Sequence, residues 1–120
     1  MADTLGASTM TNPTDHPPTR EHVQQLLDAA AAATGILPTI GQCQHLNVEL
    51  RRLLAGLDQQ LRHRQTGLTP RSRDWYAADR LLTDTGAVLA ETMGLGLLSA
   101  ATHVAALGRQ AAAVLRWLEA

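Results

Sequence analysis

Apolar residues recur at every third or fourth position along four segments of this chain, and this spacing constrains the fold more than any other feature. The clearest segment runs from Ile40 to about Arg64 and stops at Gly67. Its apolar residues are Cys43, Leu46, Leu50, Leu53 and Leu57, with Leu54 and Leu61 widening the stripe. The spacing predicts a long amphipathic helix with one buried face.

Capping signals predict where the helices begin. Thr19 is the expected N-cap of a first, shorter helix that continues to Gly35. Thr39 opens a capping box with Gln42. Thr69-Pro70 places an N-cap before a proline suited to the first position of a third helix.

The third and fourth helices also follow the apolar spacing. The third stripe contains Trp75, Ala78, Leu82, Thr85, Leu89 and Met93. Gly86 lies inside it and predicts a bend or a close helix contact. The break at Gly94-Leu95-Gly96 separates this segment from a last helix over Leu97 to Glu119.

The composition predicts an all-α fold. Ala and Leu contribute 20 residues each, and both favour helices. Phe is absent, and Trp75, Tyr76 and Trp117 are too few aromatic residues for a β-sandwich or barrel. We predict an antiparallel helical bundle of three long helices plus a shorter N-terminal helix. Residues 19–120 form its single domain, and the polar residues 1–18 form a disordered, flexible tail.

The charge and the cysteine content of the chain exclude several classes of function. The formal net charge is −1, so no overall field attracts nucleic acid or an anionic membrane. All ten basic residues are Arg, and the absence of Lys excludes Schiff-base chemistry and a P-loop lysine. The single cysteine, Cys43, fits a reducing cytoplasm. No export signal and no apolar run of about 18 residues is present, so we expect a cytoplasmic protein that does not enter membranes.

The last helix carries two apolar stripes. The first contains Leu97, Ala101, Val104, Gly108, Ala111, Leu115 and Leu118, and the second contains His103, Leu107, Gln110, Val114 and Trp117. The second stripe is a candidate partner surface, in which Trp117 anchors a homodimer and Gln110 sets its register. In the other interpretation this helix is central in its own bundle, and the short first helix covers the second stripe.

The sequence contains no pattern typical of an enzyme. Ser99 and His103 are one helical turn apart, but such pairs arise by chance in helical proteins. The Glu-x-x-His pairs of di-iron bundles are missing. We therefore expect no catalytic residue, cofactor or metal. An alternative is a small-molecule binder or enzyme with a site between helices, near Cys43, Trp75, Tyr76 and His103.

Basic residues gather around the connection between the second and third helices. The candidate basic patch contains Arg62, Arg64, Arg71 and Arg73, and its span looks like the turn of a helix-turn-helix. This patch supports the alternative of a nucleic-acid-binding regulator. The preferred interpretation is that the arginines solvate the end of a bundle and favour a helix C-terminus. The preceding helix is too long for the motif, and Asp74 and Asp79 dilute the charge.

The C-terminal half resembles a family of small proteins of unknown function from Streptomyces and other actinobacteria. The resemblance rests on Gly94–Ala101 (GLGLLSAA), on His103-Val104, Leu107 and Arg109, and on Leu115–Glu119 (LRWLE), within residues 40–119. It implies a helical fold and a loose link to natural-product (antibiotic) biosynthesis. The family has no established catalytic residues to carry over. We therefore expect a non-enzymatic helical accessory protein that acts through protein–protein contacts.

Overall fold

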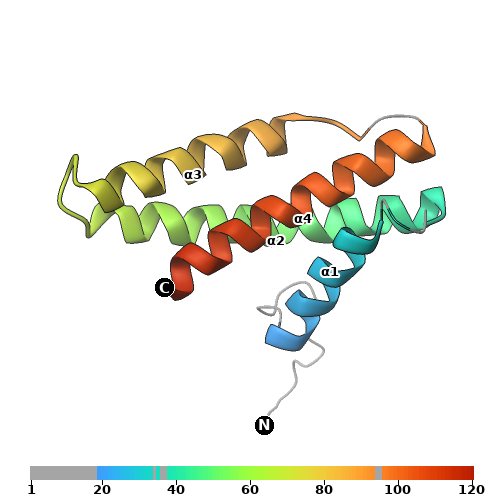
Figure 1. The fold of residues 1–120 in the computed structure, drawn as a ribbon, viewed down its shortest axis with the longest axis horizontal. Coiled ribbons are helices and arrows are strands. Elements are labelled where there is room, and N and C mark those ends of the chain that lie inside the picture. The colour runs from blue at the N-terminus through green and yellow to red at the C-terminus, as the bar shows by residue number, and fades with distance from the viewer. Residues whose placement is uncertain (1–18, 34, 36–37, 94–95) are drawn as a thin grey trace, which may run out of the picture.

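The chain forms four α-helices: α1 (Arg20–Ala32), α2 (Ile40–Thr66), α3 (Arg73–Ala90) and α4 (Leu97–Glu119). The computed structural model describes residues 19–33, 35, 38–93 and 96–120, so the predicted tail over residues 1–18 lies outside the described part. The described residues contain no strand, and α2, α3 and α4 run alternately up and down (Figure 1). The predicted all-α antiparallel bundle is confirmed.

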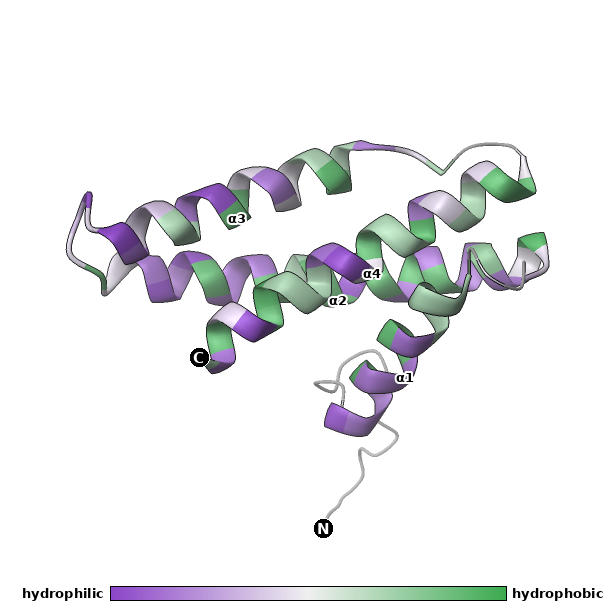
Figure 2. Cartoon of the chain, in the orientation of Figure 1, coloured by the Kyte–Doolittle hydropathy of each residue, from purple (hydrophilic) through white to green (hydrophobic). Residues whose placement is uncertain are grey.

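Helix α4 lies at the centre of the bundle. It packs against the other three helices, whereas α1 and α3 flank it and make no contact with each other (Figure 1). Buried residues from all four helices form one hydrophobic core. Figure 2 shows α4 mostly in the pale and green of apolar residues, while α2 alternates between purple and green. A central position explains why α4 has two apolar stripes.

The predicted stripe of α2 is its buried face. Leu50, Leu54 and Leu61 are fully buried, and Leu57 is nearly so. The capping box at the start of α2 is also confirmed. The amide of Gln42 donates to Thr39 Oγ1 at 3.1 Å, and the amide of Thr39 donates to Gln42 Oε1 at 2.8 Å. Local signals were sufficient here because every partner lies within one helical turn.

Helix α3 begins later than Thr69-Pro70 predicts. Arg71 has a φ of 64°, in the left-handed region that a right-handed helix cannot include. The N-cap is instead Ser72, whose hydroxyl accepts a hydrogen bond from the Trp75 amide at 3.2 Å. The proline therefore lies in the turn that reverses the chain, outside the helix.

A glycine lets α1 and α4 approach closely, but it is not the one that the sequence indicated. A Cβ added at Gly108 of α4 would lie 2.5 Å from the Cβ of Ala30, a fully buried residue of α1. A Cβ added at Gly86 meets nothing within 4 Å, so the close contact predicted there is wrong. Gly108 therefore determines the spacing of α1 and α4.

Candidate functional site

Two grooves follow the exposed side of α4, because α1 and α3 each pack on this helix without meeting. The α1–α4 groove has a volume of about 480 Å³. Its apolar lining consists of Val23, Leu27, Ala31, Ala112 and Leu115, and its polar lining consists of Arg20, Gln24, Asp28, Arg116 and Glu119. A smaller recess bounded by Leu27, Ala31, Ala105, Gly108, Arg109 and Ala112 extends it along α4.

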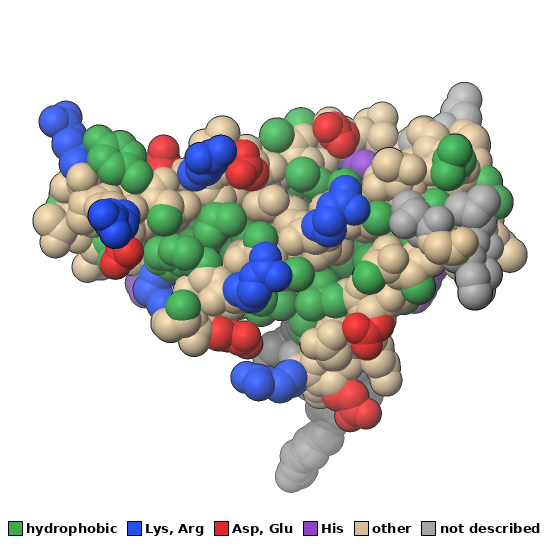
Figure 3. Space-filling view, viewed as in Figure 1, with side chains coloured by type: hydrophobic (Ala, Val, Ile, Leu, Met, Phe, Trp, Pro, Cys, Tyr) green, Lys and Arg blue, Asp and Glu red, His purple; other side chains and the backbone are tan. Residues whose placement is uncertain are grey.

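The α3–α4 groove lies on the other side of the same helix. It has a volume of about 500 Å³ and is lined by Ala77, Arg80, Leu81, Asp84, Ala113, Arg116 and Trp117. Arg116 borders both grooves, which therefore share the outer ridge of α4. Hydrophobic side chains gather on both sides of this ridge on the face drawn in Figure 3.

Apart from the Arg20–Glu119 pair that joins their ends, α1 and α4 carry opposite charges on their exposed faces beside the groove. On α4, Arg109 and Arg116 are exposed and seven residues apart, a spacing that places them on one side of the helix. On α1, the exposed acids Glu21 and Asp28 have the same spacing. None of these four residues takes part in an ion pair within the described part of the chain, whereas Arg20 and Glu119 pair at 3.7 Å. Figure 3 shows basic side chains along α4 and acidic side chains along α1, with a basic and an acidic side chain next to each other where the end of α4 nears the start of α1.

The second stripe of α4, predicted as a candidate partner surface, lies inside the bundle. Leu107 and Val114 are fully buried, and His103 is 6% exposed. Gln110 and Trp117 are half-buried. The stripe is therefore not available as the exposed dimer surface that one interpretation required.

Helix α3, and not α1, covers the middle of that stripe. The side-chain amide of Gln110 donates to Thr85 Oγ1 at 3.0 Å and to the carbonyl of Leu81 at 3.3 Å. Thr85 is fully buried, so this contact satisfies a polar group that would otherwise be costly to bury. Gln110 thus aligns α4 with α3 of the same chain. The interpretation of α4 as a central helix is confirmed, but the covering helix was predicted wrongly.

Arg51 of α2 binds the end of α3 in a polar cluster that the sequence did not reveal. Its Nη1 donates to the carbonyl of Leu89 at 2.7 Å, and its Nη2 donates to the carbonyl of Glu91. Its Nε donates to Asn47 Oδ1 at 3.1 Å. Helix α3 ends at Ala90, before the end of the predicted stripe, and these contacts satisfy carbonyl groups left free by that ending.

His103 completes this cluster from α4. Its Nε2 lies 3.3 Å from Arg51 Nη2, and a guanidinium can only donate, so Nε2 accepts and the proton of the neutral ring is on Nδ1. Nδ1 lies 4.0 Å from Glu91 Oε1. Burial and the Arg51 charge lower the pKa of His103 from its usual 6.5, against a smaller opposing effect of Glu91. The described hydrogen bonds include none between this ring and Ser99.

The structure does not assemble the small-molecule site predicted near the cysteine and the aromatic residues. The Trp75 carbonyl accepts a hydrogen bond from Gln65 near the end of α2, at 3.2 Å. Cys43 is buried near the start of that helix, 22 residues earlier and therefore about 33 Å away. Trp75 and Tyr76 contact each other edge to face, with ring centroids 5.2 Å apart. Cys43, His103 and the Trp75–Tyr76 pair therefore lie in three separate parts of the bundle.

Two arginines of the candidate basic patch have partners within the chain. Arg62 pairs with Asp58 at 2.9 Å, and Arg64 donates to the Leu118 carbonyl in the last turn of α4 at 3.2 Å. Arg71 and Arg73 are exposed. The contact of Arg64 with the last turn of α4 is favourable, because the carbonyl end of a helix attracts positive charge.

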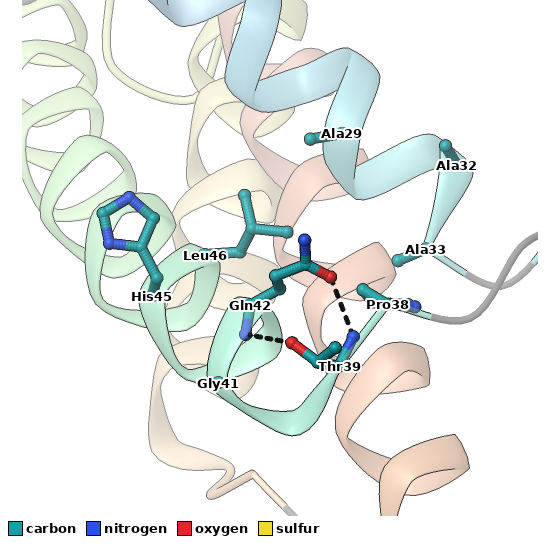
Figure 4. A pocket seen from close by; sticks show the side chains of 9 residues that line it. All are labelled: Ala29, Ala32, Ala33, Pro38, Thr39, Gly41, Gln42, His45 and Leu46. Carbon is teal, nitrogen blue, oxygen red and sulfur yellow. Dashed lines mark hydrogen bonds between the residues drawn. The ribbon is translucent and has the colours of Figure 1, made fainter.

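A further pocket lies where α1 meets the start of α2 (Figure 4). It has a volume of about 720 Å³ and is lined by Ala29, Ala32, Ala33, Pro38, Thr39, Gly41, Gln42, His45 and Leu46. The Thr39 hydroxyl is occupied by the capping box, as the dashed lines in Figure 4 show. Among the described residues of this lining, His45 is the one ionisable side chain, so the recess suits an apolar group better than a reacting one.

Comparison of the chain with protein-family models, with curated proteins and with solved structures finds no match. Among the described residues, no three His, Cys, Asp or Glu side chains are grouped to hold a metal ion. No described helix is long and apolar enough to cross a membrane. The resemblance to an actinobacterial family stays a prediction.

Proposed function

We propose that this chain is a non-enzymatic helical protein-interaction module that binds protein through the exposed side of α4. The observation that carries this proposal is the open packing of the bundle. Helices α1 and α3 both pack on α4 but not on each other, which leaves two apolar grooves beside one ridge. Contiguous apolar surface bordered by charge is typical of an interaction site.

The polar side chains inside the bundle support this function rather than catalysis. His103 faces Arg51 and Glu91, and Gln110 faces Thr85. Each of these contacts joins two helices, so each has a structural role. The ring nitrogen of His103 that could accept a proton already faces the Arg51 guanidinium, which disfavours a role as general base.

The resemblance noted in the sequence supports a more specific setting. A helical accessory protein linked to natural-product biosynthesis, acting in the cytoplasm of an actinobacterium, fits a chain whose surface binds protein. The nucleic-acid alternative has less support, because internal contacts occupy Arg62 and Arg64.

Site-specific photo-crosslinking in the cells that make the protein tests the proposal. A photoreactive amino acid replaces Ala31, an exposed residue of the α1–α4 groove, and in a matched control it replaces Ala55, an exposed residue of α2. We expect a discrete covalent protein adduct, of this chain with itself or with another protein, from position 31 and none from position 55. Equal adducts from both positions, or none from position 31, would overturn the proposal.

A further inference from the structure

We propose that the occupant of the α1–α4 groove is a second copy of this chain, with α1 of each copy lying on α4 of the other. The inference rests on the proposed function and names its partner. It uses the side of α4 opposite the stripe containing Leu107 and Val114, which the bundle buries. The recess beside Ala105 and the groove reaching Glu119 together span 15 residues of α4, about 22 Å.

The groove fits a helix better than an extended segment. Its walls are helices, whose backbone groups bond within themselves, so they offer no edge to which an extended chain could bond. A helix needs no such edge, because its backbone hydrogen bonds are already formed within the helix. Helix α1 has 13 residues, a length of about 20 Å that matches the groove.

Two contacts determine how α1 and α4 are aligned within one chain. Arg20 pairs with Glu119 at one end, and Ala30 meets Gly108 further along. Counting between these points places Glu21 level with Arg116 and Asp28 level with Arg109, each within about 3 Å along the helices. The two acids of α1 and the two arginines of α4 are thus exposed at matching heights along the two helices.

A two-fold axis running along the groove, on the α1 side of its centre, then gives a complementary interface. Rotation about this axis places α1 of the second copy in the groove beside α4 of the first, without sliding it along the groove. Glu21 then lies over Arg116 and Asp28 over Arg109, and symmetry repeats both contacts. An axis across the groove would instead place acid on acid and Arg on Arg, an arrangement that repulsion disfavours.

Sedimentation equilibrium of the full chain with two charge-reversed variants tests this arrangement. Variant A carries Arg109→Glu with Arg116→Glu, and variant B carries Glu21→Arg with Asp28→Arg. We expect wild type to dimerise at tens of micromolar and each variant alone to dimerise at least tenfold more weakly. An equimolar mixture of A and B restores opposite charges at all four contacts, so we expect it to form a heterodimer.

A matched control separates this interface from general attraction between oppositely charged chains. Asp74→Arg with Asp79→Arg changes the net charge as variant B does, but on exposed acids of α3. This control should dimerise with itself as wild type does, and it should form no heterodimer with variant A. If variant B unfolds by circular dichroism, Glu21→Gln with Asp28→Asn removes the acids and should also weaken the dimer.

Three results would overturn the inference: a monomeric wild type, variants that dimerise as wild type does, or a control that forms a heterodimer with variant A as readily as variant B does. A monomer that still crosslinks to a different protein from position 31 would overturn the second copy as occupant and leave the proposed function standing.

Discussion

Replacing Gly108 with alanine should destabilise the bundle, although alanine is the better helix former. The change alone would favour the helix by about 1 kcal/mol. The added Cβ, however, would lie 2.5 Å from the Cβ of Ala30, and carbon atoms in contact prefer about 3.5 to 4.0 Å. Helices α1 and α4 must therefore separate by about 1 Å. Overpacking of this kind costs about 1–3 kcal/mol.

Gly86→Ala is the matched control, because the same substitution on α3 meets nothing within 4 Å. Both variants gain the helix propensity of alanine, so the difference in their free energies of unfolding isolates the overlap at Gly108. We expect Gly108→Ala to be less stable than Gly86→Ala by about 2 kcal/mol, or roughly 8 °C in melting temperature for a chain of this size.

Urea and thermal denaturation followed by circular dichroism measure this difference. Combining Gly108→Ala with Ala30→Gly removes the opposing Cβ, so the double variant should lose less stability than the sum of the two single changes. Equal stability of Gly108→Ala and Gly86→Ala would refute the close approach of α1 and α4.

Three further predictions concern the core, the buried histidine and the basic patch. Leu50→Ala should lower the free energy of unfolding by about 2–5 kcal/mol in a urea titration, because Leu50 is fully buried. Val48→Ala, on the exposed side of α2, should change it little. Equal losses of stability in the two variants would mean that the buried face of α2 is assigned wrongly. The lowered pKa of His103 means that the folded chain binds fewer protons than the unfolded chain, so stability should be complete above about pH 6.5 and should decrease as the pH falls below it. His103→Gln should flatten this pH dependence of urea unfolding, and an unchanged slope would contradict the assignment. Fluorescence anisotropy should detect no specific DNA binding at physiological salt; salt-sensitive binding that is lost in Arg71→Ala or Arg73→Ala would favour the regulator instead.

The sequence predicted only part of the exposed surface of α4. The two stripes of α4 were visible, but the exposed charges beside them were not recognised. Glu21 and Asp28, like Arg109 and Arg116, have a seven-residue spacing that can be read from the sequence. The sequence does not show which helices are neighbours, so the acids of α1 could not be matched with the arginines of α4. The contact between Ala30 and Gly108 supplies that missing information.

The turn between α2 and α3 shows a limit of local signals. Thr69-Pro70 and Ser72 are both plausible helix starts, and their side chains alone do not choose between them. Arg71 has a left-handed backbone conformation, so the helix cannot begin before Arg71 and Ser72 is the N-cap. That backbone conformation belongs to the reversal that brings α3 alongside α2.

The sequence by itself determined that this chain is helical, where α2 lies and which of its faces is buried. Those features depend on side chains within one or two turns of each other, as in the stripe through Leu50 and the capping box at Thr39. Tertiary structure alone decided that α3 covers the second stripe of α4 and that the grooves beside Arg116 stay open. The physical reason is that helices of similar hydrophobicity can pack on one another in several arrangements. Contacts between distant residues, such as Gln110 with Thr85 and Gly108 with Ala30, select one of them.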